Sequence, residues 1–285
     1  MGQKAIAPVA VVIPCYNSAK TLLRAVESVA QQSVLPKKVV LVDDCSSDQT
    51  IQLMHEIQNR FKSINIELVF NKTNLGAGSA RNLGWSRCTE QDYICFLDSD
   101  DSWASQKIEI QYQFMKNNPS VVLSGHDYEY LTEIPQKNDL IKLNYEVSNL
   151  PFNFVLLKNP FITPSIMVKV NSEIKFLQHS THMEDHLFII ETANRYKTVR
   201  KIMLPLAYIY KPIYGSSGLS SQLIKMEFGN QKNLNYLLDK KIINNRLKFI
   251  LSIISYIKLL KRIIIITVRK ISIFSPKMFM LNTYK

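Results

Sequence analysis

Short apolar runs alternate with segments of helical periodicity along the first third of the chain. Continuous β-branched runs bounded by turn residues are typical of strands buried in a parallel sheet, and apolar residues one helical turn apart indicate helices. We expect strands at 9–13, 38–42, 66–70 and 93–97, and helices at 18–32, 49–61 and 79–88. This alternation predicts βαβ units and therefore an α/β fold with a mostly parallel sheet flanked by helices.

Polar residues follow each predicted strand at the point where it ends. The four groups are Pro14 to Asn17, Asp43 with Asp44, Asn74 to Asn82, and Asp98 to Asp101. Because the carboxyl ends of parallel strands share one edge of a sheet, we expect these groups to converge on one crevice. A single group of this kind is also explained as a turn or a helix cap. Four of them together favour a binding site.

The third and fourth groups indicate particular ligands. Asp98, Asp100 and Asp101 supply the carboxylate oxygens that Mg²⁺ and Mn²⁺ prefer, so they predict a divalent cation site. The loop Gly76-Ala77-Gly78 resembles a dinucleotide-binding fingerprint, but Arg81 stands where the third glycine belongs and the loop follows a third strand. An arginine there suggests a partner for a diphosphate group.

The second half of the chain offers one acidic group beside an apolar helix at 187–193, namely Glu184 with Asp185. Such a pair is either an acidic first turn favoured by the helix dipole or a source of a general base. The segment 159–176 is expected to form strands of an antiparallel extension. The remaining candidates are expected to be structural or acceptor-side histidines, His126, His179, His182 and His186, and packing tryptophans, Trp85 and Trp103.

The net charge of +12 is concentrated at the end of the chain, since residues 240–285 contain eleven Lys and Arg and no acidic residue. Without a basic patch elsewhere, sequence-specific nucleic-acid binding is disfavoured, and we expect no nucleic-acid partner. The stretch 247–274 separates basic from apolar positions imperfectly at ~100° per residue, and no uncharged run reaches the ~20 residues of a membrane span. We expect a basic amphipathic helix on an anionic membrane surface, with packing on the protein's own core as the alternative.

The four cysteines have neither CxxC spacing nor a disulfide-dense pattern, which suits a reduced, cytoplasmic setting. The apolar stretch near the N-terminus is short and ends at Pro14, so it is interpreted as a first strand and not as a signal peptide.

Five segments in this order, "VVIPCYN", "VVLVDDCSSDQT", "NLGAGSARNLGW", "YICFLDSDDSW" and "HMEDHLF", resemble glycosyltransferase family 2, the inverting transferases of the GT-A fold, and the resemblance covers residues 8–220. It implies a nucleotide-sugar site with Pro14 and Tyr16 beside the base, one of Asp43 and Asp44 bonded to it, and Arg81 near base or phosphate. The full set of implied donor-site residues is Pro14, Tyr16, Asn17, Asp43, Asp44, Gly76, Arg81, Asp98, Ser99 and Asp100.

The resemblance also assigns the metal and the chemistry. Asp98 and Asp100 would form the DxD motif that holds Mn²⁺ or Mg²⁺, with Asp101 as a substitute, and Asp185 would be the catalytic base with Glu184 beside it. Residues 163–165 would lie near the acceptor pocket. The stretch 210–220 would be either a lid over the diphosphate or a plain linker.

These implications divide the chain into a nucleotide-sugar-binding half, 1–125, an acceptor-binding and catalytic half of the same domain, 126–222, and a basic helical tail, 223–285. We expect a metal-dependent transferase that moves a sugar from a nucleotide diphosphate, UDP favoured, to a hydroxyl of a glycan or glycolipid acceptor. Its expected place is cytoplasmic, peripheral on the inner face of the cytoplasmic membrane, in assembly of lipopolysaccharide or capsule. Alternatives are a polyprenyl-phosphate glycosyltransferase and a non-catalytic membrane-binding module with a degenerate transferase domain.

Overall fold

The structure is a computed structural model that describes residues 4–132, 144–178, 182–210 and 222–274. His179 and nearly all of the stretch expected as a lid or linker lie outside the described residues. The chain divides into two compact units, Met1–Lys211 and Pro212–Lys285, and each is described by itself.

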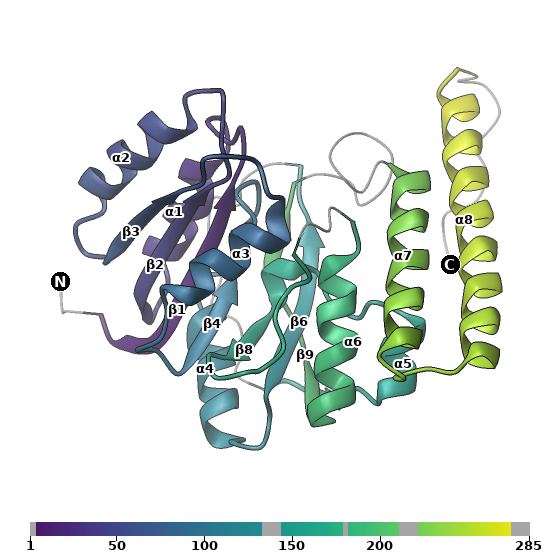
Figure 1. The fold of residues 1–285 in the computed structure, drawn as a ribbon. Coiled ribbons are helices and arrows are strands. Elements are labelled where there is room, and N and C mark those ends of the chain that lie inside the picture. Colours follow the sequence, from purple (N-terminus) through teal and green to yellow (C-terminus); the bar gives the residue numbers. More distant parts are fainter. Residues whose placement is uncertain (1–3, 133–143, 179–181, 211–221, 275–285) are drawn as a thin grey trace. The chain divides into compact units, whose positions relative to one another are not determined.

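One sheet organises the first unit (Figure 1). Its strands are β1 Ile6–Cys15, β2 Leu35–Asp43, β3 Ile66–Phe70, β4 Tyr93–Phe96, β5 Ser102–Trp103, β6 Leu123–Tyr130, β7 Val147–Asn149, β8 Met167–Lys169 and β9 Val199–Ile209. The strand order is β3-β2-β1-β4-β8-β6-β9-β5, and β7 pairs with β9. The first four strands, β1 to β4, are parallel to one another, whereas β8 runs antiparallel between β4 and β6.

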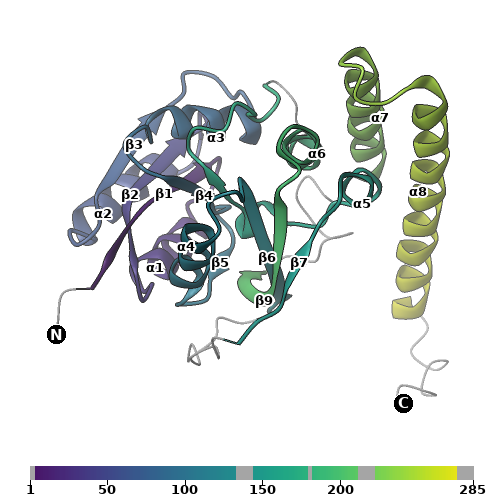
Figure 2. The ribbon, with the colours of Figure 1, turned by 90° about the horizontal axis from the view of Figure 1, so that it is seen from below.

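Helices cover both faces of this sheet. They are α1 Leu22–Ala30, α2 Thr50–Arg60, α3 Ala77–Ser86, α4 Lys107–Asn117, α5 Phe152–Leu157 and α6 Glu184–Tyr196, with a 3₁₀ turn at Thr163–Ser165. Figure 2 shows α3 and α6 on one face and α1 and α4 on the other. Successive side chains of a strand point to opposite faces of the sheet, so one strand packs against helices on both sides. Val11 and Ile13 of β1 share a buried cluster with α1. Val12, which points the opposite way, lies against Gly84 of α3.

The elements predicted in the first half are confirmed, and β3 has the bounds expected from the sequence. Within 159–176, the expected antiparallel extension is confirmed in one strand, β8, and the rest of the segment is not strand. Beyond β8, the backbone at Phe176 pairs with a side chain instead of a neighbouring strand. Its N–H donates to Asn82 Oδ1 at 3.1 Å, and its carbonyl accepts from Asn82 Nδ2 at 2.7 Å. The Phe176 ring then stacks on Phe188.

The second unit contains two helices, α7 Leu223–Asp239 and α8 Asn245–Phe274. The helix expected at 247–274 is therefore confirmed as α8. The sequence pattern had not predicted α7 as a separate helix. Across the described parts of the chain, no helix combines the length and apolarity that crossing a membrane requires.

Candidate active site

The ends of β1 and β2 lie side by side and form the first wall of the site. Cys15 is in register with Asp43, and the Asp44 N–H donates to the Cys15 carbonyl at 2.8 Å. Asn17 follows with a positive φ of 50°, and its Oδ1 accepts from the Ser47 N–H at 2.9 Å. The first two strand-end groups therefore form one connected surface, as the parallel arrangement predicted. The Tyr16 side chain stands 53% exposed on it.

Asp43 and Asp44 are both buried but differ in their partners. Asp44 holds the following loop, because its carboxylate accepts from Asn71 Nδ2 at 2.8 Å, from the Leu75 N–H at 3.0 Å and from the Gly76 N–H at 2.8 Å. Asp43 Oδ2 accepts from the Ser46 N–H at 3.1 Å, but its Oδ1 is buried without a partner among the described residues. An unpaired buried carboxylate oxygen is costly and suits a site that a ligand donor completes.

The Asp98–Asp101 loop is fixed from two sides. Ser99 Oγ and Ser18 Oγ form a hydrogen bond of 2.7 Å, and Arg24 of α1 donates to the Asp100 carbonyl. The Arg24 guanidinium also lies over the Tyr210 ring, 3.7 Å from its centroid. Sequence reasoning missed Ser18 and Arg24. The signal for Arg24 was a cation inside an otherwise apolar helical stretch.

Arg81 joins the two halves of the first unit. Its side chain is 6% exposed and donates to Asp98 Oδ1 at 2.8 Å and to Glu184 Oε1 at 3.3 Å. The start of α3 lies against the start of α6, since a Cβ added to Gly78 would stand 3.1 Å from Glu184 Cγ. The structure therefore brings Asp98 and Glu184 together through one guanidinium, and a glycine permits that approach.

The electrostatics of this cluster are dominated by acids. Burial raises the pKa of Asp98, Arg81 lowers it, and the charges of Asp100 and Asp185 raise it further. Burial likewise raises the pKa of Glu184, with Arg81 opposing and Asp185 adding to the effect. Several carboxylates around a single arginine leave an excess of negative charge, and a cation would relieve it.

Asp185 lies in the first turn of α6, directly after Met183 in the left-handed region at a φ of 64°. Asn159 Nδ2 donates to its Oδ2 at 3.0 Å, and Asn159 Oδ1 accepts from the Phe161 N–H at 3.2 Å. Asn159 therefore fixes the orientation of the predicted base. Sequence reasoning did not single it out.

The carboxylates of Asp98 and Asp100 fit a divalent cation. Asp98 and Asp100 are half-buried carboxylates close enough that the charge of Asp100 raises the pKa of Asp98, which fits a shared hard cation. Over the residues whose placement is described, no cluster of three or more His, Cys, Asp or Glu side chains could by itself hold a metal. The two aspartates would therefore need oxygens from a bound ligand, as Mg²⁺ sites with substrate phosphates often do.

The remaining sequence candidates are structural in this conformation. Thr163 and Ser165 are buried, and the Pro164 carbonyl accepts from Trp103 Nε1 at 2.8 Å. The packing role predicted for Trp85 and Trp103 is confirmed by their exposures of 3% and 1%. The buried histidines have backbone partners, because His126 Nδ1 bonds with the Asp127 carbonyl and His186 Nε2 with the Val155 carbonyl, both at 2.7 Å.

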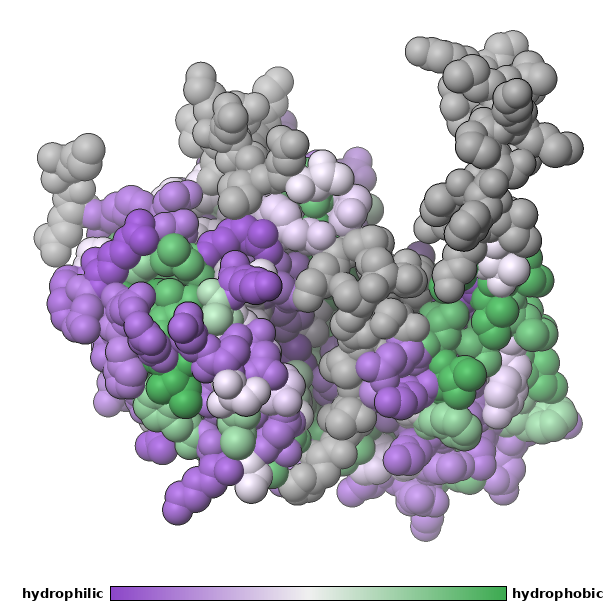
Figure 3. Space-filling view, turned by 90° about the horizontal axis from the view of Figure 1, so that it is seen from above, coloured by the Kyte–Doolittle hydropathy of each residue, from purple (hydrophilic) through white to green (hydrophobic). Residues whose placement is uncertain are grey.

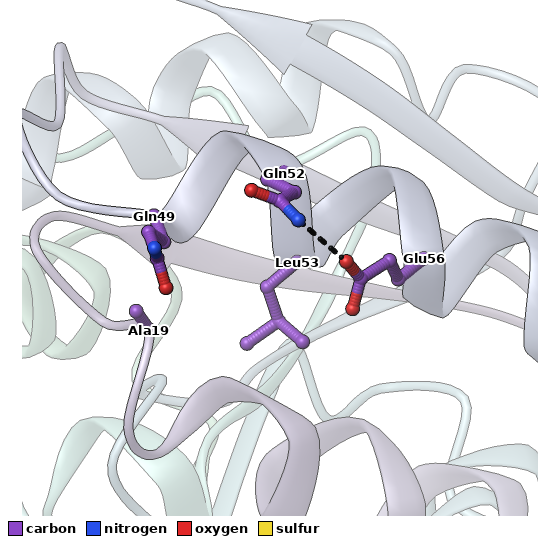
Figure 4. Close-up of a pocket in the computed structure, with 5 residues that line it drawn as sticks. All are labelled: Ala19, Gln49, Gln52, Leu53 and Glu56. Atoms are coloured by element: carbon purple, nitrogen blue, oxygen red, sulfur yellow. Dashed lines mark hydrogen bonds between the residues drawn. The ribbon is translucent and has the colours of Figure 1, made fainter.

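A separate hollow beside α2 is lined by Ala19, Gln49, Gln52, Leu53 and Glu56 (Figure 4). Gln52 Nε2 donates to Glu56 Oε1 at 3.0 Å across its edge. Its volume is about 110 Å³, below the ~300 Å³ at the lower end of ligand pockets. It contains none of the predicted donor residues, so we do not count it as part of the site.

Solved structures with this fold are glycosyltransferases of low sequence identity. The S. aureus TarS 1–349 structure in complex with UDP-GlcNAc has a TM-score of 0.65 at 19% identity, over 86% of this chain and 70% of that one. The mannosyltransferase PcManGT from Pyrobaculum calidifontis, in complex with GDP-Man and Mn²⁺, has a TM-score of 0.60 at 14% identity, over 96% of this chain and 84% of that one. These likenesses establish the GT-A fold.

Sequence comparison gives the family. An uncharacterized glycosyltransferase of Haemophilus influenzae is 30% identical over 66% of this chain and 73% of its own length. The amylovoran biosynthesis glycosyltransferase AmsB of Erwinia amylovora is 37% identical, but over only 35% of this chain and 33% of its own length. The putative teichuronic acid biosynthesis glycosyltransferase TuaG of Bacillus subtilis is 36% identical over 38% and 41%. The sequence model of glycosyl transferase family 2 matches residues 10–174, more than half of the chain. The chain belongs to glycosyl transferase family 2.

Proposed function

We propose that this glycosyltransferase moves a hexosyl or N-acetylhexosaminyl group from a nucleotide-diphosphate sugar, UDP favoured, to a hydroxyl of a glycan or glycolipid, with inversion. The observation that carries the proposal is the acidic cluster around Arg81, in which Asp98 of the first half and Glu184 of the second share one guanidinium. Family membership and the GT-A fold support it.

The base of the donor would bind at the ends of β1 and β2. The buried, unpaired Oδ1 of Asp43 matches the ring N–H donor of uracil, and the exposed ring of Tyr16 offers a surface for stacking. Because the Asp44 carboxylate is already bonded to Asn71, Leu75 and Gly76, Asp43 is the better candidate of the two. A UDP-GlcNAc complex of TarS, which has the same fold, is consistent with a uridine donor.

The diphosphate would lie over the Asp98–Asp101 loop, where Asp100 and Asp98 would hold Mn²⁺ or Mg²⁺. When bound, the cation would supply charge neutralisation to the departing nucleoside diphosphate. The protein's own part is to keep the loop rigid through Ser18 and Arg24, and to oppose, through Arg81, the rise in the pKa of Asp98 that its burial causes.

Asp185 would take the proton of the acceptor hydroxyl as that oxygen attacks the anomeric carbon. A bond forms between the acceptor oxygen and the anomeric carbon while the bond from that carbon to the phosphate oxygen breaks, and the electron pair stays on the diphosphate. Inversion follows because attack and departure take place on opposite faces. Asn159 would hold Asp185 in the orientation that this transfer needs.

The acceptor would belong to a surface polysaccharide, as the names of the amylovoran and teichuronic acid relatives suggest. We place the enzyme in the cytoplasm, peripheral on the inner face of the cytoplasmic membrane, because the acid-free, basic C-terminal tail suits an anionic membrane surface that holds a lipid-linked acceptor.

The experiment screens UDP-, GDP- and dTDP-sugars for slow hydrolysis, with Mn²⁺ and with a chelator. We expect one donor class to be hydrolysed in a metal-dependent manner, and Asp100→Ala to abolish the reaction. In transfer assays Asp185→Asn should remove activity while nucleoside diphosphate still raises the melting temperature. No hydrolysis of any nucleotide sugar would contradict the proposal, and transfer to polyprenyl phosphate that survives Asp185→Asn would replace the hydroxyl acceptor with an anionic one.

A further inference from the structure

The two helices of the second unit are joined by a polar seam. Ser255 Oγ of α8 accepts from Asn230 Nδ2 at 2.7 Å and donates to Glu227 Oε2 at 2.6 Å. Ser252 Oγ donates to Gln231 Oε1 at 2.9 Å. Two serines in a helix rich in isoleucine are thus explained by their partners on α7. They fix which side of α8 faces α7.

Of the four apolar residues that fall on the basic side of α8 in the sequence pattern, Leu251, Leu259, Ile265 and Ile266, the first two lie on this same side. Leu251 and Leu259 fall one helical turn before and after Ser255, and Leu251 is 5% exposed. The sequence placed both leucines on the basic half of the helix. With α7 present, they belong to the contact between the two helices, so the hairpin needs no further protein core for them.

The opposite side of α8 is apolar and exposed. Its members lie within an arc of about 140° at ~100° per residue, and the exposed apolar residues there are Phe249, Ile250, Ile253, Tyr256, Ile257, Leu260, Ile263 and Ile264. Phe249 is 67%, Ile257 60% and Ile264 61% exposed. Figure 3 shows hydrophobic surface gathered on this unit. A contiguous apolar stripe of this extent on a protein surface marks an interaction site.

The charge beside this stripe indicates which kind of partner binds there. Lys261 lies at its edge, ~20° beyond Ile250 around the helix, and no acidic residue occurs after Asp239. We infer that the α7–α8 hairpin docks on an anionic lipid bilayer, with the Phe249–Ile264 stripe among the acyl chains and Lys261 at the phosphate level. A protein partner would need an apolar groove with acidic residues around it. An anionic bilayer combines an apolar interior with negatively charged headgroups over its whole surface. The inference rests on the proposed function only for its purpose, which is to bring the active site to a lipid-linked acceptor.

The test uses the full chain and vesicles of phosphatidylcholine with and without phosphatidylglycerol, sedimented without any nucleotide sugar. We expect binding to the phosphatidylglycerol vesicles, and Ile257→Glu should weaken it by roughly tenfold or more. The matched control is Ile6→Glu at the start of β1, where the side chain is 59% exposed against 60% at Ile257. It should bind as the wild type does. Lys261→Glu should weaken binding to the anionic vesicles and leave the residual binding to neutral vesicles unchanged.

Equal binding of Ile257→Glu and the wild type would overturn the inference, and so would equal weakening by Ile6→Glu. A dimer that Ile257→Glu dissociates, without vesicle binding by the wild type, would assign the stripe to a second copy of the chain. Nucleotide-sugar hydrolysis is measured on the same variants without vesicles. If the wild type binds vesicles but hydrolyses no nucleotide sugar, the result contradicts the proposed transferase function and leaves the membrane inference intact.

Discussion

The amide of Asn159 donates to the carboxylate of Asp185 at 3.0 Å, and its own carbonyl oxygen is held by the Phe161 N–H. The predicted catalytic base therefore has a fixed orientation before any acceptor arrives. A group that fixes the orientation of the base contributes through the geometry of proton transfer and not through donor binding.

Replacing Asn159 tests this positioning role. Asn159→Ala should lower kcat roughly 10-fold to 100-fold with little change in the donor KM. Asn159→Asp replaces the amide donor with a like charge beside Asp185, so it should lower kcat further than Asn159→Ala does. Asn149→Ala, which removes an exposed amide bonded to Arg200, is the control and should leave kcat unchanged. An equal loss of kcat in both Asn159 variants, accompanied by a rise in the donor KM, would indicate a structural role only.

Arg81→Met should destabilise the fold by about 3 kcal/mol or more, because it leaves the carboxylates of Asp98 and Glu184 without their shared partner. The measurement is chemical denaturation. The matched control is Arg60→Met, which breaks an exposed pair with Glu27 at 3.0 Å and should cost only ~0–1 kcal/mol. Similar losses in both variants would argue against the buried network.

Asp43 and Asp44 should separate into a ligand group and a structural group. Asp43→Asn should weaken binding of the nucleoside diphosphate while the melting temperature of the free protein stays near that of the wild type. Asp44→Asn turns an amide toward a backbone N–H, so it should cost about 1–3 kcal/mol of stability. Thermal-shift titrations with UDP, GDP and dTDP measure both effects, and the reverse assignment would show up as a stable, non-binding Asp44 variant.

Lys107 should give the stability a dependence on pH. The side chain is fully buried, and its Nζ is 3.9 Å from the centroid of the Trp103 ring. Burial lowers the pKa of Lys107, and the Cys95 thiol offsets only part of that effect. The unfolded chain therefore binds a proton that the folded chain binds less well, so stability rises with pH up to the ordinary lysine pKa.

Lys107→Met removes this cost. It should stabilise the protein by ~1–3 kcal/mol near pH 7, and the gain should shrink as the pH approaches the ordinary lysine pKa of ~10.4. Lys116→Met, on an exposed position of the same helix, should show neither effect. Denaturant unfolding of both variants near both ends of this pH range decides the point, and a gain that does not change with pH would contradict the assignment.

The parts of the fold that were predictable have local signals. β3 is bounded by turn residues and is an apolar run interrupted only by Glu67, so its limits followed from the sequence. β6 was missed because polar residues occupy its buried positions. Ser124 and His126 are fully buried there, with Gln111 of α4 donating to the Ser124 carbonyl. A strand whose buried polar groups are satisfied by hydrogen bonds from the preceding helix has no apolar period in its sequence.

The same distinction applies to the site. Groups at strand ends could be assembled from the sequence, because a parallel sheet brings those ends to one edge. The bond between Arg81 and Glu184 spans 103 positions, and that between Asn159 and Asp185 spans 26 positions. Nothing in the local pattern of either residue specifies its partner. The choice between Asp43 and Asp44 likewise required the contacts of the loop at Gly76.

The sharing of Arg81 between Asp98 and Glu184 has a consequence for engineering. A chimera that grafts the acceptor-binding half of another transferase onto this chain must supply an acid at the start of its α6, or Arg81 will lose one of its two carboxylate partners and keep only Asp98. Exchange of acceptor specificity is therefore easier in segments away from that first helical turn, and the crossover point matters more than the overall likeness of the two parents.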